Sequence, residues 1–335
     1  MNLLGEYKLL QSDLKKHYLK IQGDITKCTK LLNDKDNMGD ILSKSDLEVL
    51  LKPLGLIITV RAHKLFFRAV SCLQKIAMFT STHNTENVLL VLQLILPICQ
   101  DEDIEEMVQI KMLQTLMLYL DPKNTKIDRQ LIKLILVCIF RLYETTSSLV
   151  KNTALATLRQ LFSLIFENLN TVDPDDKESE IYGTAKELLV GLHCTFDPDY
   201  DKNPNWPLIS NDESRLLALD LYCLVIVTTK EHLKKFPEFM NFIQDQIVPE
   251  LKPYFKNVSE YKFGIQLIRL FNFLVQYLGI GLEVLIEFMG TLIDCKQWVT
   301  RVVFELGSII LTDVSLVRQI LSNNELTGHL NMSLL

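Results

Sequence analysis

The sequence predicts an all-α protein built as an α-solenoid, in which antiparallel helix pairs stack in the manner of HEAT or armadillo repeats. Apolar residues recur at the i, i+3, i+4, i+7 spacing of helices along most of the 335 residues. Helix breakers are scarce, with 12 glycines and 10 prolines, and the connections between periodic stretches are short. No strict repeat consensus is present in the sequence. The solenoid prediction therefore depends on the period and length of the helices.

The composition limits the classes of function. The formal net charge is -6, whereas general nucleic-acid binders carry an excess of Lys and Arg, so we expect no nucleic-acid partner. The seven cysteines include no Cys-x-x-Cys pair, which is typical of reduced thiols in a cytosolic protein. No signal peptide opens the chain, and its longest charge-free stretch, Asn87 to Gln100, is shorter than the roughly 17–25 residues of a membrane-spanning helix. We expect a cytoplasmic protein with peripheral membrane contact.

The first helix is expected over residues 2–22, where apolar side chains alternate in steps of three and four. Lys15, Lys16 and Lys20 lie on or beside its polar side. Residues 1–35 carry seven lysines against four acids, a positive segment in an acidic chain. These lysines indicate either a solvated helix face or a patch that binds anionic lipid or a partner.

The helical pattern resumes after a polar turn at 33–40. Ser45 and Glu48 have the spacing of a capping box, so a helix is expected to start there and to run toward Pro53. The apolar run at 56–60 has the composition of a strand, but no partner strand follows. It is interpreted as buried helix.

Four more helices follow in the first half of the chain. Pro97 is expected to close one of them, and Asp103 with Glu106 to cap the next. Seven consecutive apolar residues at 134–140 predict that the last of the four is central. The four helices are expected at 61–79, 86–96, 104–120 and 127–143.

The helix expected at 150–166 has an unusual start. Its apolar and small residues recur at helical spacing. The residues predicted to form its buried face are Ala154, Thr157, Leu158, Leu161 and Ile165. Because Ala154, Ala156 and Thr157 are small, another backbone is expected to come close at this point.

The clearest break in composition lies at 169–181, which holds five acids and one lysine. We expect an acidic linker there, between a helical domain at 1–168 and a second at 182–335. Ser210 is expected to begin a capping box in the second domain. Its helices are expected at 181–194, 212–229, 231–243, 245–255, 259–279, 281–293, 296–311 and 313–321.

The sequence lacks the common motifs of catalysis and metal binding. The sequence contains no phosphate-binding loop, nucleophile elbow or His-Glu-x-x-His motif. Residues 197–201 start like a calcium loop, but Lys202 and Leu208 occupy positions that require Gly and Glu. His193 and Cys194 are a single adjacent pair, too few ligands for zinc. We expect a binding protein without catalytic residues, metal or cofactor.

Four short segments carry a resemblance to a known family. They are Leu10–Leu14, Leu113–Leu116, Cys138–Leu142 and Asn152–Gln160. With them, the chain resembles the N-terminal region of the Mon-two family, relatives of the large Arf guanine-nucleotide exchange factors. The last segment is the most specific, because it meets the family pattern Asn-Thr-Ala-x-Ala-Thr-x-Arg-Gln at every fixed position. In the second half the resemblance is looser and depends on helix order and on Trp298, Arg301 and Val302.

Two departures place the chain within this superfamily. The catalytic exchange factors carry an Asn-Tyr-Asp-Cys box where this chain has Asn323-Asn324-Glu325-Leu326. The chain also ends at Leu335 without a Sec-seven domain. The resemblance therefore favours the non-catalytic Mon-two branch, and we expect the chain to be an N-terminal fragment of a longer protein.

The resemblance implies a "dimerisation and cyclophilin-binding" domain at 1–168 and a "homology upstream of Sec-seven" domain at 182–335. It further implies a peripheral scaffold of the trans-Golgi network and endosomes. The expected partners are a Dopey-type protein, a phospholipid flippase, an Arf-like GTPase, a second copy of the chain, and an anionic membrane that contains phosphatidylinositol 4-phosphate. Two alternatives stay open: the autoregulatory region of a large Arf exchange factor, and an unrelated HEAT-type transport adaptor.

The family motif supplies the candidate partner-binding residues, Asn152, Arg159 and Gln160. Asn152 is expected to cap its helix or to bond a neighbouring turn. Arg159 and Gln160 are too polar for the packed face. They either tie this helix to adjacent helices or contact a partner.

Overall fold

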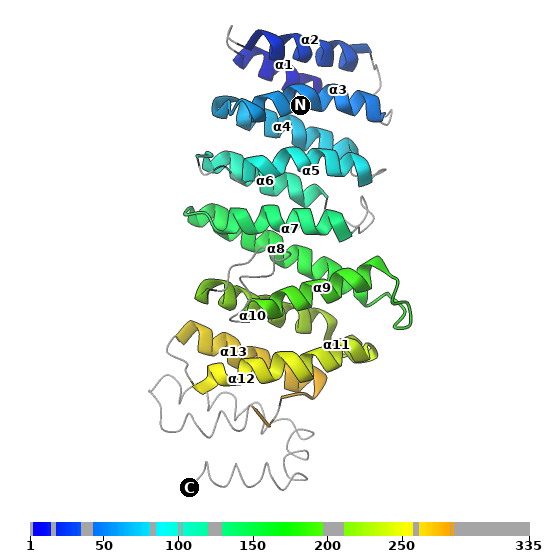
Figure 1. The fold of residues 1–335 in the computed structure, drawn as a ribbon, viewed down its shortest axis with the longest axis vertical. Helices are drawn as coiled ribbons and strands as arrows, with labels where there is room; N and C mark the ends of the chain where they lie inside the picture. Colours follow the sequence, from blue (N-terminus) through cyan, green and yellow to red (C-terminus); the bar gives the residue numbers. More distant parts are fainter. Residues whose placement is uncertain are drawn as a thin grey trace. The chain divides into compact units, whose positions relative to one another are not determined.

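The computed structural model describes residues 3–14, 18–34, 43–80, 85–99, 101, 103–119, 129–196, 211–256, 261–281 and 283–284. Within these ranges all regular structure is helical and no strand occurs, which confirms the all-α prediction (Figure 1). Among the described helices, none has the length and hydrophobicity needed to span a bilayer. The helices predicted at 296–311 and 313–321 lie outside the described residues.

The chain divides into two compact units, Met1–Leu164 and Ile165–Leu335. Successive helix pairs of the first unit lie in layers, and α3 contacts α2 and α5 while α4 contacts α1 and α6 (Figure 1). The middle pair thus packs on the pair before it and on the pair after it. The helices of this unit are α1 (Leu3–Asp13), α2 (Leu19–Asp34), α3 (Lys44–Thr59), α4 (His63–Thr80), α5 (Thr85–Cys99), α6 (Glu106–Leu118), α7 (Arg129–Tyr143) and the larger part of α8 (Ser148–Leu169).

The first predicted helix, 2–22, is wrong in its extent. α1 ends at Asp13 and α2 begins only at Leu19. Ser12 lies in the last turn of α1, and its Oγ donates to the carbonyl of Leu9 at 2.7 Å. Such side chains compete with the backbone for hydrogen bonds and favour a helix end.

The third helix begins earlier and ends later than the sequence predicted. Its capping box is formed by Ser43 and Asp46, not by Ser45 and Glu48. The Asp46 N–H donates to Ser43 Oγ at 3.2 Å, and the Ser43 N–H donates to Asp46 Oδ2 at 3.0 Å. Both pairs have the same sequence spacing, so the pattern alone does not choose between them. α3 then continues through Pro53 to Thr59, which confirms a helix over most of the apolar run at 56–60.

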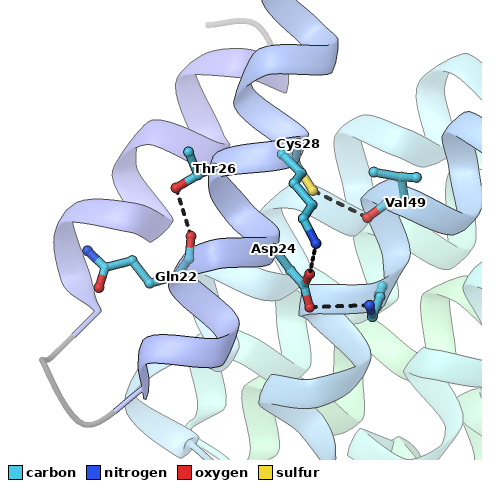
Figure 2. A network of polar contacts seen from close by, with 7 residues as sticks. Gln22, Asp24, Thr26, Cys28 and Val49 are labelled. Atoms are coloured by element: carbon cyan, nitrogen blue, oxygen red, sulfur yellow. Dashed lines mark hydrogen bonds and ion pairs between the residues drawn. The ribbon is translucent and has the colours of Figure 1, made fainter.

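A thiol compensates for the proline inside α3. Pro53 has no N–H, so the carbonyl of Val49, four residues earlier, has no amide donor within the helix. Cys28 of α2 donates its Sγ–H to this carbonyl at 3.3 Å (Figure 2). Close by, the buried hydroxyl of Tyr7 in α1 donates to the carbonyl of Leu50 at 2.6 Å. Neighbouring helices therefore supply hydrogen-bond donors to the carbonyls of α3 near Pro53.

Asp24 of α2 adds an ion-pair network to the same contact between α2 and α3. The side chain of Asp24 is 10% exposed and lies 3.2 Å from Lys27 Nζ and 3.6 Å from Lys52 Nζ (Figure 2). Burial disfavours the charged carboxylate, but the hydrogen bond from Lys27 and the charge of Lys52 outweigh it, so the pKa of Asp24 lies below its usual value. A buried carboxylate is thus paired, as it must be to stay charged.

Two further boundary predictions in the first unit are wrong. Pro97 lies inside α5 and does not close it. Pro97 and Gln93, the residue whose carbonyl loses its amide donor, are both exposed, so water can bond the free carbonyl. Asp103 and Glu106 do not cap α6, whose N-cap residue is Glu105, without a side-chain capping bond.

The central position of α7 is confirmed. Most of its apolar side chains are at most 9% exposed. The buried set is Leu131, Ile132, Ile135, Leu136, Cys138, Ile139, Phe140, Leu142 and Tyr143. Nearly continuous apolar sequence therefore corresponds to burial on most sides of this helix.

The second unit is more irregular than the sequence predicted. Residues 170–179 form successive turns, and α10 is capped by Asn211, which accepts a bond from the Ser214 N–H at 2.8 Å, where Ser210 was expected to begin a capping box. The helix predicted at 231–243 begins as a 3-10 helix and ends in a π-helical turn. The elements are α9 (Glu180–Cys194), α10 (Asp212–Thr229), the 3-10 helix η3 (Lys230–Lys235), α11 (Pro237–Phe242), the π-helix η4 (Ile243–Ile247), α12 (Val248–Lys256), α13 (Tyr261–Phe273) and the π-helix η5 (Leu274–Leu278).

Candidate partner-binding surfaces

The start of α8 is fixed by Ser147, not by Asn152. The Val150 N–H donates to Ser147 Oγ at 3.3 Å, as an N-cap requires, and that hydroxyl donates to Glu106 Oε2 of α6 at 2.5 Å. Asn152 lies within the first turns of α8 and is exposed. The expectation that Asn152 caps the helix is therefore wrong, because the helix begins four residues earlier.

The buried face of α8 is the face that the sequence predicted. Each of its side chains is at most 3% exposed. The set is Ala154, Thr157, Leu158, Leu161 and Ile165. Ala156 differs, because it is exposed and does not belong to the packed face. Thr157 satisfies its hydroxyl within the helix by donating to the carbonyl of Thr153 at 2.9 Å.

The opposite side of α8 carries four exposed positions of the family motif. Asn152, Ala156, Arg159 and Gln160 are all exposed, at steps of four, three and one that place them on one helical face. Leu149, three residues before Asn152, is 53% exposed and continues the same face. We call these five residues the α8 surface. It joins an apolar side chain to amide and guanidinium groups, a combination typical of protein contacts.

The predicted lysine patch is only partly described. Lys15 and Lys16 lie outside the described residues. Lys20 is exposed, but it belongs to α2 and not to the first helix. It follows Leu19, which is 73% exposed. A cation beside an exposed apolar side chain is compatible with a membrane surface, and the lipid patch stays a prediction.

A groove in the second unit was missed by the sequence analysis. It has a volume of about 370 Å³ and lies between α9 on one side and α11 with η4 on the other. Apolar side chains line it together with polar and charged ones. The lining residues are Tyr182, Lys186, Leu189, Val190, Glu238, Phe239, Asn241, Phe242, Asp245 and Gln246. Its two sides are more than forty residues apart in sequence, and no motif in either side signals the pairing.

Glu238 organises one end of this groove. Its carboxylate accepts bonds from Lys177 Nζ at 2.6 Å, from Lys186 Nζ at 3.0 Å and from the Tyr182 hydroxyl at 2.9 Å. These hydrogen bonds lower the pKa of Glu238 to about 2. Burial, together with the bond to Glu238, raises the pKa of Tyr182 to about 12. The cluster holds the acidic turn at 170–179 against α11, because Lys177 belongs to that turn.

Side chains that could bind a metal or react covalently do not gather in the described part of the chain. No group of three or more His, Cys, Asp or Glu residues is placed there to hold a metal ion. The six described cysteines are free, and burial raises the pKa of the Cys28 thiol to about 12. His193 lies 2.9 Å from Glu250 of α12, measured from Nδ1 to Oε2.

Comparison with known proteins adds sequence relationships to this geometry. Residues 1–173, just over half of the chain, match the Mon2/Sec7/BIG1-like dimerisation and cyclophilin-binding domain. A MON2 homologue of Schizosaccharomyces pombe is 24% identical over 194 residues, which are 56% of this chain and 12% of that protein. A MON2 homologue of Xenopus laevis is 21% identical over 264 residues, 66% of this chain and 15% of that protein. The chain thus matches only a small part of the length of these relatives.

Proposed function

The chain belongs to the family with a Mon2/Sec7/BIG1-like dimerisation and cyclophilin-binding domain, and from this premise we propose that it is a non-enzymatic scaffold in membrane trafficking. It works peripherally on the trans-Golgi network and on endosomes. Its helix pairs continue as an α-solenoid that presents long surfaces to partner proteins. The proposed partners are a Dopey-type protein, a phospholipid flippase, an Arf-like GTPase and a second copy of the chain.

One observation carries this proposal. Asn152, Arg159 and Gln160 are motif residues, and all three are exposed on the α8 surface. A buried motif is explained by packing, whereas exposed polar side chains at fixed positions of a binding-type chain favour a contact surface. We assign these three residues to partner binding. Lys15, Lys16 and Lys20 are assigned to anionic lipid, including phosphatidylinositol 4-phosphate.

The location of the chain in cells tests this function. A fluorescently tagged chain is expected to concentrate on puncta that carry trans-Golgi and endosomal markers. A variant with Arg159→Ala and Gln160→Ala is expected to become diffuse if partners recruit the chain. A diffuse or nuclear-envelope signal from the unaltered chain would contradict the proposal.

A second function is favoured by the breadth of the matched domain. That domain is shared by Sec7- and BIG1-like proteins. The chain is then the autoregulatory region of a large Arf exchange factor. Reading the parent gene beyond Leu335 separates the two functions, because a Sec-seven domain is either encoded there or not. The family match argues against an unrelated transport adaptor.

A further inference from the structure

The groove between α9 and α11 belongs to the second unit and shares no residue with the α8 surface. One side is a single face of α9, with Tyr182, Lys186, Leu189 and Val190 at steps of four, three and one. Val190 is 38% exposed, although it is apolar and lies beside the buried ring of Phe239 in the lining. The groove therefore presents an accessible apolar side chain among polar ones.

The other side of the groove changes geometry along its length. α11 ends at Phe242, and the chain continues as the π-helix η4 before α12 begins. Asp245 and Gln246 line the groove from this π-helical turn. π-helical turns inside longer helices occur frequently at functional sites. Both Asp245 and Gln246 are exposed, so their polar groups are accessible from the groove.

The charges around the groove are predominantly negative. Lys186 of the lining and Lys177 of the adjacent turn are both bound to Glu238, and Tyr182 stays neutral because its pKa is about 12. Lys177 belongs to the acidic turn at 170–179. This turn and the first residue of α9 carry five exposed acids, and Asp245 of η4 is a sixth. The five acids are Asp173, Asp175, Asp176, Glu178 and Glu180.

The turn is also ordered where it meets the groove. The Asp175 N–H donates to Asp173 Oδ1 at 3.1 Å, and the Asp176 N–H donates to the Asp173 carbonyl at 2.9 Å. Together with the bond from Lys177 to Glu238, these contacts keep the acidic turn at the groove. Apolar side chains beside an acidic turn that is tied to Glu238 complement a ligand that is apolar on one face and basic around it.

We propose that the α9–α11 groove binds a short amphipathic helix of a partner protein, whose apolar face is flanked by Lys and Arg. The apolar side chains of that helix pack on Val190 and Phe242, in the helix-in-groove manner. Its basic side chains lie toward Asp245 and toward the acidic turn. This surface belongs to the second unit alone, so its function is independent of the α8 surface.

Binding of designed peptides to the whole 335-residue chain tests the proposal. Two labelled peptides of about five helical turns share leucines at i, i+3, i+4 and i+7 and differ only in carrying Lys or Glu elsewhere. Fluorescence anisotropy at physiological salt is expected to show binding of the Lys peptide and not of the Glu peptide. Equal binding of the two peptides, or tighter binding of the Glu peptide, would overturn the proposal.

Matched variants separate the groove from general attraction to an acidic protein. Val190→Lys places a cation in the groove lining, and Val60→Lys places the same cation on the exposed end of α3. The groove variant is expected to weaken binding of the Lys peptide by about tenfold or more, and the control by less than about twofold. Circular dichroism checks that both variants keep their helices. Equal affinities of the two variants would overturn the proposal.

Discussion

Cys28 donates its thiol to the carbonyl of Val49 at 3.3 Å, and this is the carbonyl that Pro53 leaves without an amide donor in α3. Cys28 is fully buried and Val49 is 40% exposed, so this bond lies at the edge of the packed contact between α2 and α3. The cysteine of one helix thus compensates for the proline of the next. The pair explains why α3 runs through Pro53, where the sequence predicted that the helix would approach its end.

Replacing Cys28 with Ala tests this compensation. The variant is expected to lose about 0.5–1.5 kcal/mol of unfolding free energy, because the partly buried carbonyl of Val49 loses its hydrogen bond. In a Pro53→Ala background the amide of the substituted residue supplies the missing donor, so the same replacement should cost less. Urea unfolding of the four proteins in this double-mutant cycle gives the coupling.

The control for that cycle is Cys72→Ala. Cys72 is as fully buried as Cys28, but it belongs to α4. Its replacement is expected to cost the same with Pro53 as without it. If Cys28→Ala also cost the same unfolding free energy with Pro53 as without it, the thiol would not compensate for the proline.

Glu238 predicts a dependence of stability on pH. Its pKa is lowered from 4.5 to about 2 by bonds from Lys177, Lys186 and Tyr182. A depressed carboxyl pKa stabilises the folded chain above the unfolded pKa, and this stabilisation is lost as the pH falls from about 4.5 toward 2. Glu238→Gln is therefore expected to lower the melting temperature at pH 7, and the difference from the unaltered chain should shrink below about pH 4.

Glu178→Gln is the control for this pH series. Glu178 is exposed in the acidic turn, so its replacement removes one carboxylate of the same kind. The melting temperature of the control is expected to stay close to that of the unaltered chain at every pH of the series. A Glu238→Gln difference that stayed constant down to pH 2 would contradict the assignment of the pKa shift.

Much of the fold follows from the period of apolar residues, because helices bury one face. The buried face of α8 was predicted residue by residue, and the central position of α7 was predicted from its run of apolar residues. Helix ends were predicted less well, since Ser43 with Asp46 and Ser45 with Glu48 have the same spacing. Only the contacts of the folded chain decide which pair caps the helix.

The candidate sites were predictable to different degrees. The α8 motif is contiguous in sequence, so Asn152, Arg159 and Gln160 could be found before their exposure was known. The groove depends on Lys177 and Lys186, which lie 61 and 52 residues before Glu238 in the sequence and belong to no motif. Long-range pairing of this kind has no local signal.

The lipid prediction has a direct test. If Lys15, Lys16 and Lys20 meet an anionic membrane, each contributes about 1 kcal/mol of binding near the surface. Changing all three to Glu is expected to abolish sedimentation of the chain with anionic liposomes. Unchanged sedimentation would contradict the assignment of these lysines.

A matched charge control is needed for the liposome experiment. Lys230, Lys234 and Lys235 are exposed lysines of the second unit, at η3. Changing these three to Glu makes the same difference in net charge. This control is expected to keep sedimenting, because screened attraction depends on lysines that lie near the membrane.

The central claim is that the α8 surface binds partner proteins, and co-precipitation from cells measures it most directly. The test variant is Arg159→Ala with Gln160→Ala, and the control is Arg141→Ala with Gln130→Ala, the same residue types exposed on α7. We expect the test variant to lose its Golgi and endosomal partners while its melting temperature stays within a few degrees of the control. Retention of those partners by the test variant, or a large fall in its melting temperature, would contradict the claim, since Arg159 and Gln160 would then serve the fold.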